Sequence, residues 1–171
     1  MKLLKIASVF LVLASLTVMA VFAQNRPRST ADSVRGHFAA INRKILEMAK
    51  DFPEDKYSFR PKPEMRSFSE ALVHIASGNV YASKAGRGEK VNWDELDAKN
   101  FKTKAEVVAL MEKSIADANA TLKTIPDEAF TKAVEPWFGV TEHNAEHYGQ
   151  LVVYYRDSGL VPPASRPGNN N

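Results

Sequence analysis

Four segments of the chain repeat their apolar side chains at steps of three and four residues, which is the period of an amphipathic α-helix. The segments cover about residues 29–51, 67–84, 103–125 and 140–157. Each has a single apolar stripe, so none is stable alone and the four must bury their stripes against one another. No segment alternates with the period of a strand. The sequence therefore predicts an all-α fold, a four-helix bundle with helices about 30 Å long.

Local signals indicate where two of these helices begin. Ser67 with Glu70, and Thr103 with Glu106, are capping boxes, in which a hydroxyl and a carboxylate bind the free amides of a helix start. The last helix is expected to begin near residue 140, about one turn before His143. The positive end of that helix would then favour a neutral imidazole at this histidine.

The first 23 residues have the layout of a secretory signal peptide. Lys2 and Lys5 precede an uncharged and mostly apolar run over residues 6–23, and Ala23 is the small residue before a cleavage point. The run is also just long enough to span a bilayer, so an uncleaved membrane anchor is the alternative. Cleavage after Ala23 predicts a periplasmic or secreted protein, with one domain over residues 24–165 and a disordered polar tail over residues 166–171.

The composition limits which partners and which metal ligands the chain can have. The 171 residues fit one domain, and without Lys2 and Lys5 the chain has 21 basic and 20 acidic residues. That balance gives no reason to expect a nucleic-acid partner, and a membrane is a partner only if the leader is retained. The chain has no cysteine, so a metal must be bound by His, Asp, Glu or backbone oxygen.

The histidines are the main candidates for a site. His143 and His147 lie one helical turn apart, so both imidazoles can bind one cation at about 2.0–2.1 Å, with two solvated histidines as the alternative. Residues 143–147 also match the motif of inverted zinc peptidases, in which the Glu acts as general base. That mechanism needs an acidic ligand well downstream, and Asp157 is the one carboxylate among the 24 residues that follow His147. We therefore reject the peptidase interpretation.

His74 offers a third ligand from the second helix. It lies at the edge of an apolar stripe, and Ala71 and Gly78, one turn away on either side, leave space beside its ring. A core histidine that is hydrogen-bonded to a neighbour is the alternative. His37 has no companion at metal-binding spacing and is left out of the site.

Two stretches resemble the DinB-like (damage-inducible) family of four-helix metalloproteins. Residues 66–75 resemble the second-helix motif of that family. Residues 143–163 resemble its last helix and the segment that follows it, and they begin with the pattern H-x-x-x-H-Y-G-Q. The resemblance covers about residues 30–165. It implies one divalent metal ion held by His74, His143 and His147, with zinc or nickel favoured among the metals that imidazoles accept. It also implies a small-molecule substrate and a possible homodimer.

Two classes of function follow from this resemblance. An exported metal-dependent enzyme would be a hydrolase or a transferase that uses a small thiol; export disfavours the thiol, because reduced thiols are maintained mainly in the cytosol. The alternative is a non-catalytic metal- or ligand-binding bundle. The catalytic residues are unknown: Glu146 is an acid–base candidate or a solvated side chain, and Trp93 and Trp137 either wall a pocket or pack under a loop. Gln150 is expected to point away from the ligand pair.

Overall fold

The computed structural model describes residues 29–168, which form five α-helices and three short 3-10 helices and contain no strand. The all-α prediction is confirmed for this part of the chain. The helices are α2 (Thr30–Asp51), α3 (Phe68–Gly86), α4 (Lys104–Thr124), the short α5 (Asp127–Ala133) and α6 (Glu135–Asp157), and the 3-10 helices are η1 (Glu54–Lys56), η2 (Ala98–Asn100) and η3 (Pro163–Ser165). The sequence did not predict α5. The proposed leader, residues 1–23, lies outside the described residues.

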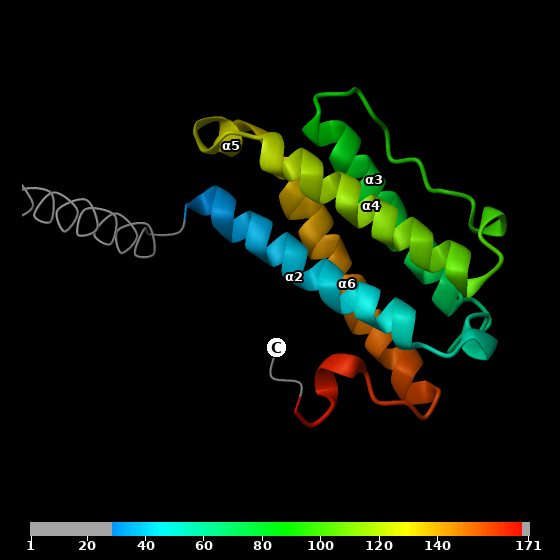
Figure 1. The fold of residues 1–171 in the computed structure, drawn as a ribbon. Helices are drawn as coiled ribbons and strands as arrows, with labels where there is room; N and C mark the ends of the chain where they lie inside the picture. Colours follow the sequence, from blue (N-terminus) through cyan, green and yellow to red (C-terminus); the bar gives the residue numbers. More distant parts are fainter. Residues whose placement is uncertain (1–28, 169–171) are drawn as a thin grey trace, which may run out of the picture.

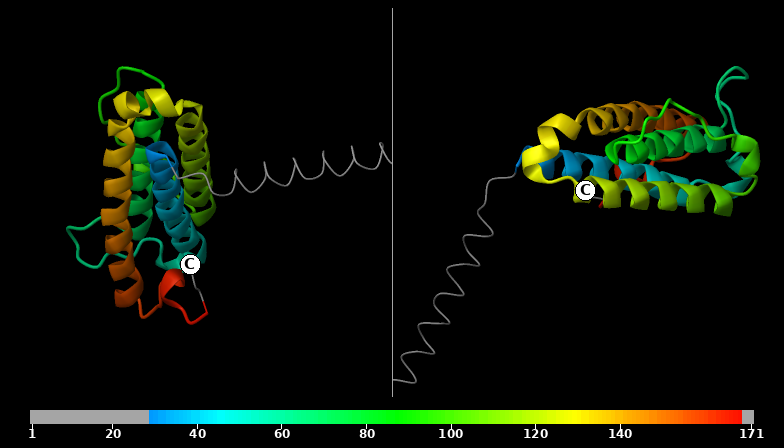
Figure 2. Two further views of the ribbon diagram at one scale, coloured as in Figure 1. Left: turned by 90° about the vertical axis from the view of Figure 1, so that its left-hand side faces the viewer. Right: turned by 90° about the horizontal axis from the view of Figure 1, so that it is seen from above.

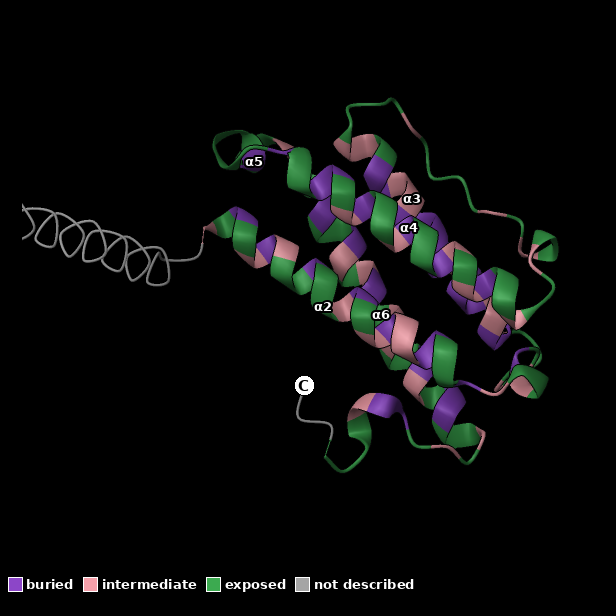
Figure 3. Ribbon diagram, in the orientation of Figure 1, coloured by how far each residue is buried: buried purple, intermediate pink, exposed green. Residues whose placement is uncertain are grey.

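The axes of the four long helices are roughly aligned, and the helices enclose a core (Figures 1 and 2). Both α2 and α3 pack against α4 and α6, so each long helix has two neighbours. Buried residues face inward on all four helices, and exposed residues cover the outside (Figure 3). Within residues 29–168, no helix combines the length and the apolar character that crossing a membrane requires.

Capping boxes begin three of the long helices. At α3, Ser67 Oγ accepts from the Glu70 amide at 3.2 Å, and the Glu70 carboxylate accepts from the Ser67 amide at 2.8 Å. Thr103 and Glu106 form the same pair at α4, which confirms both predicted boxes. A third box begins α2.

The predicted start of the last helix is wrong. Helix α6 begins at Glu135, about two turns before His143, so this histidine lies well inside the helix. Pro136 occupies the first turn, where a proline has no helical hydrogen bond to lose. The next residue, Trp137, is fully buried and packs edge-on against Phe38 of α2 at 5.7 Å between ring centroids. This packing secures the first turn of α6 against the core.

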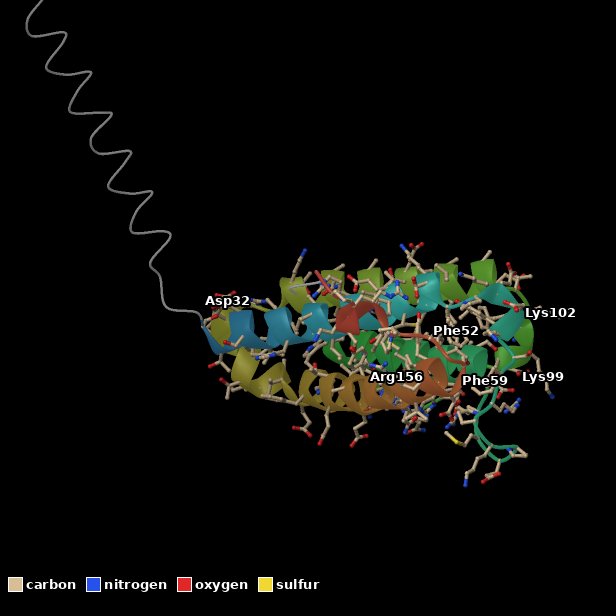
Figure 4. All side chains as sticks on the ribbon, turned by 90° about the horizontal axis from the view of Figure 1, so that it is seen from below. Asp32, Phe52, Phe59, Lys99, Lys102 and Arg156 are labelled. Atoms are coloured by element: carbon tan, nitrogen blue, oxygen red, sulfur yellow. The ribbon has the colours of Figure 1, made fainter. Side chains whose placement is uncertain are left out.

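The apolar core has two parts, one toward each end of the bundle. One part contains the stacked rings of Phe52 and Phe68, whose centroids lie 3.9 Å apart, and the other contains Phe38 and Trp137. Figure 4 labels Phe52 near the end where Lys99 and Lys102 lie, and Asp32 at the opposite end. Along α2, α3 and α6, a buried asparagine separates the two parts. The long helices are therefore joined by apolar contacts at both ends and by a polar layer between them.

The chain leaves α6 through η3 and returns to α2. Arg166 belongs to the segment expected to be a disordered tail, and its guanidinium contacts both carboxylate oxygens of Asp51, at 2.8 and 2.5 Å. The hydroxyl of Tyr155 donates to the same carboxylate at 3.2 Å. Residues 169–171 lie outside the described residues.

Candidate metal centre

Three histidine rings converge between α3 and α6. The ring centroids of His74 and His143 lie 4.9 Å apart, those of His74 and His147 4.6 Å, and those of His143 and His147 4.4 Å. One ring nitrogen from each lies within 4.8 Å of the other two, and all three residues are half-buried. The expected convergence is thus confirmed. His37 is exposed on α2 and does not belong to this cluster.

The Nδ1 atom of each ring faces an oxygen. His147 Nδ1 lies 2.8 Å from Oε1 of Gln150, and His143 Nδ1 lies 3.1 Å from Oδ1 of Asn144. His74 Nδ1 is buried and lies 3.1 Å from Oε1 of Glu95. The two atoms are within ion-pair distance, but their geometry is not that of a hydrogen bond. Gln150 was expected to point away, and that expectation is wrong. Metal-binding imidazoles commonly donate this second nitrogen to such an acceptor.

A connector brings Glu95 to the site. After α3 the chain turns back alongside that helix to reach the start of α4 (Figure 1). The Leu96 amide donates to Ser77 Oγ of α3 at 3.0 Å, which ties the connector down one residue after Glu95. Arg66 also holds the Glu95 carboxylate, with its guanidinium 3.2 Å from both oxygens. Sequence reasoning missed Glu95, because a charged residue in an irregular segment carries no periodic signal.

Asn144 connects His143 to a buried amide network. Asn42 of α2, Asn79 of α3 and Asn144 of α6 are all fully buried. Asn144 Nδ2 donates to Oδ1 of Asn42 at 3.1 Å and to Oδ1 of Asn79 at 3.0 Å, while Asn79 Nδ2 donates to Asn42 Oδ1 at 3.1 Å. The three side chains therefore link three helices behind the histidine cluster.

A backbone carbonyl fixes which amide group donates and which accepts in each hydrogen bond of this network. Asn42 Nδ2 donates to the carbonyl oxygen of Phe38 at 2.9 Å, and a carbonyl can only accept. Asn42 therefore turns its oxygen toward the other two amides, so both hydrogens of Asn144 Nδ2 are used and its oxygen faces His143. His143 must then carry its proton on Nδ1, which leaves the Nε2 lone pair free for a cation.

The Nε2 atoms of His143 and His74 face each other at 3.0 Å. His74 Nδ1 makes no hydrogen bond, so in the metal-free protein Nε2 of His74 can carry the ring proton and donate it to Nε2 of His143. Two nitrogens bound to one tetrahedral zinc at about 2.1 Å would lie about 3.4 Å apart, close to the distance seen. The donor set therefore fits a divalent cation.

Burial favours the neutral form of His74 and His147. Loss of solvent, and after it the neighbouring His143, lower the pKa of His147 to about 4. The pKa of His74 is also lowered, first by burial and then by the positive charge of Arg66, while Glu95 opposes this shift. Neutral imidazole is the form that binds a metal ion.

The remaining candidate residues fall into two groups. Trp93 lies against the histidines, with its ring centroid 5.6 Å from that of His74 and 5.4 Å from that of His143, and its side chain is 45% exposed. Trp137 is part of the core instead. Glu146 is exposed, as its solvated interpretation predicted.

The chain matches the DinB superfamily over residues 37–155, a range that includes all three histidines of the cluster. The protein therefore belongs to this superfamily, in agreement with the resemblance of its second and last helices. No curated protein matches the chain.

The first prediction concerns the tautomer of His143. Replacing Asn144 with alanine removes the acceptor of the Nδ1 proton and leaves Asn42 and Asn79 short of partners. We expect the unfolding free energy to fall by about 1–3 kcal/mol and His143 to become a mixture of tautomers. Chemical denaturation and long-range proton–nitrogen NMR measure the two effects. Asn119→Ala on α4 is the control, and an unchanged His143 tautomer in the Asn144 variant contradicts the argument.

The second prediction concerns pH. The pKa of His147 is about 4 in the folded metal-free protein and about 6.5 in an unfolded chain, so the unfolded state binds more protons between these values. The stability of the metal-free protein should therefore fall as the pH drops from about 6.5 to about 4. Thermal unfolding across this range measures the effect. The decline should be shallower in His147→Gln, and equal slopes in the two proteins would show that His147 titrates normally.

Proposed function

We propose that the protein binds one divalent cation through Nε2 of His74, His143 and His147 and that it is a metal-dependent hydrolase of a small molecule. The observation that carries the proposal is the common orientation of the rings, in which every Nδ1 faces an oxygen. One ring nitrogen of each histidine lies within 4.8 Å of the other two, and the Nε2 atoms of His74 and His143 are 3.0 Å apart. A cation bound between the three rings would accept their lone pairs.

Three imidazoles leave coordination positions open, which is typical of a reactive site. Bound there, zinc or nickel would supply Lewis-acid chemistry. The protein's own part is to hold the rings: Asn144 and Gln150 orient His143 and His147, and Glu95 lies beside His74. Trp93 shields one side of the cluster from water. We assign the four long helices to the bundle of the superfamily, with α5 as an addition before α6.

A non-catalytic metal-binding protein is the second candidate, and the placement of the carboxylates favours it. Glu95 is held by Arg66 and His74, and Glu146 is exposed, so neither is poised as an acid–base group. A panel of hydrolysis and thiol-conjugation reactions separates the candidates. Turnover that requires both metal and His74 supports the enzyme, whereas a fully loaded protein without turnover supports the binding protein.

The third prediction concerns metal content. The purified wild-type chain should bind one zinc or nickel ion, measured by elemental analysis and titration calorimetry. Alanine at any of His74, His143 or His147 should lower the affinity by more than the roughly 10- to 100-fold that follows loss of an outer partner. Circular dichroism should change little, because apolar packing holds the helices together.

His37→Ala is the matched control, since it removes an exposed histidine from outside the cluster. It should leave both affinity and stoichiometry unchanged. If the three cluster variants bind as tightly as the His37 variant, the metal lies elsewhere and the proposal is wrong.

We further propose that the protein is exported and that its leader is cut after Ala23. The charged and apolar pattern of residues 1–23 supports this, and so does the start of the fold, because the cap of α2 at Ser29 follows closely after the proposed cut. The fourth prediction is that the exported protein begins at Gln24, as read by N-terminal sequencing. A retained Met1 in a membrane fraction would identify the leader as an anchor.

A further inference from the structure

A cavity of about 390 Å³ opens between α3 and α6 beside the histidine cluster. His143 forms part of both the cluster and the cavity wall, so a group that fills the cavity lies next to the proposed metal ligands. Most of the remaining lining is carbon, contributed by Gly78, Tyr81, Trp93, Pro136, Gly139 and Val140. Cavities of this size and composition are typical of small-molecule sites.

Two glycines keep the cavity open. A Cβ at Gly78 would lie 3.1 Å from both Cε1 and Nδ1 of His143 and 3.4 Å from Trp93, so a larger residue would press on the ligand ring. A Cβ at Gly139 would meet nothing within 4 Å, and this position is exposed on α6. A side chain at Gly139 would therefore extend into open space at the cavity.

Aromatic rings form one wall. The ring centroids of Trp93 and Tyr81 lie 5.7 Å apart, and the planes meet at 50°. Trp93 also contacts the rings of His74 and His143, so it borders the cavity and the cluster together. A flat ring placed against Trp93 and Tyr81 would find both faces and edges to pack against, and aromatic pairs of this kind are favourable beyond the area they bury.

A second recess, on the His147 side of the cluster, has the opposite character. Its lining includes Glu64, Arg66 and Gln150, whose charged and amide groups suit polar groups rather than hydrocarbon. The cavity at His143 has one charged residue in its lining, Glu135, whose carboxylate repels anions. Apolar and polar groups of a ligand would therefore lie on different sides of the histidines.

We propose that the cavity beside His143 is the subsite for an uncharged aromatic group of the substrate. The proposal rests on the proposed metal site, because the reacting group next to this ring must reach the three histidines. It identifies the substrate class as a small molecule with an aromatic ring adjacent to the group that is attacked.

Two hydroxamates test this subsite. Acetohydroxamate carries only a metal-chelating group, and phenylacetohydroxamate adds a benzyl ring to the same group. With the zinc-loaded mature chain, calorimetry should show that phenylacetohydroxamate binds about tenfold more tightly or better. Gly139→Leu should abolish this difference and leave acetohydroxamate binding as it was, and Trp93→Ala should reduce the difference between the two compounds. Both positions are exposed, so neither change removes core packing.

Matched variants provide the controls. Phe138→Ala removes an exposed ring that does not line the cavity, and Gly36→Leu adds the same side chain to an exposed glycine of α2. Both should retain the wild-type difference. If acetohydroxamate binds and the benzyl ring adds nothing, or if Trp93→Ala and Gly139→Leu keep the gain, the subsite is wrong and the metal site stands. If neither compound binds the zinc-loaded protein, the proposed function fails and the subsite with it.

Discussion

The buried hydrogen bonds among Asn42, Asn79 and Asn144 are the interaction on which both the bundle and the site depend. Amides inside a core are costly unless their polar groups find partners, and here each asparagine uses another helix to do so. Sliding α2, α3 or α6 by one turn would separate the three side chains, whereas apolar residues at either end would tolerate the shift far better. The network therefore selects one register for three helices. The same register places His143, the residue before Asn144, at the edge of the core.

Sequence reasoning predicted what is local. Helical periods and capping boxes are contained within a few residues, and so is the one-turn spacing of His143 and His147. The amide network is different, because its partners lie 37, 65 and 102 residues apart and a buried asparagine looks like any other asparagine in the sequence. His74 was grouped with the pair because a family pattern supplied the long-range information that its own surroundings lack, and its ring does lie beside theirs. Glu95 had neither kind of signal.

The errors in α6 also have physical causes. Pro136 and Gly139 suggest a break in the helix, yet the proline occupies the one turn that accepts it, and the burial of Trp137 stabilises that turn. Gln150 was placed by its angle around the helix alone. Helical side chains lean toward the N-terminus, so a residue three positions after His147 reaches back to its ring. The direction in which a side chain leans, more than its angle around the helix, decides which residues contact the histidine rings.

The location of the histidines reconciles two demands on such a site. Metal ligands need a rigid setting, which a core provides, but a substrate needs access, which a core denies. The asparagine layer meets the first demand from the inner side by orienting His143, while burial favours the neutral form of His74 and His147. On the outer side the connector brings Trp93 and Glu95 back over α3 without closing the site, since both residues remain exposed. An irregular segment is suited to this role, because it can present an aromatic wall and a carboxylate at spacings that a helix does not offer. The bundle thus provides the three histidines, and the connector that joins α3 to α4 shapes what can approach them.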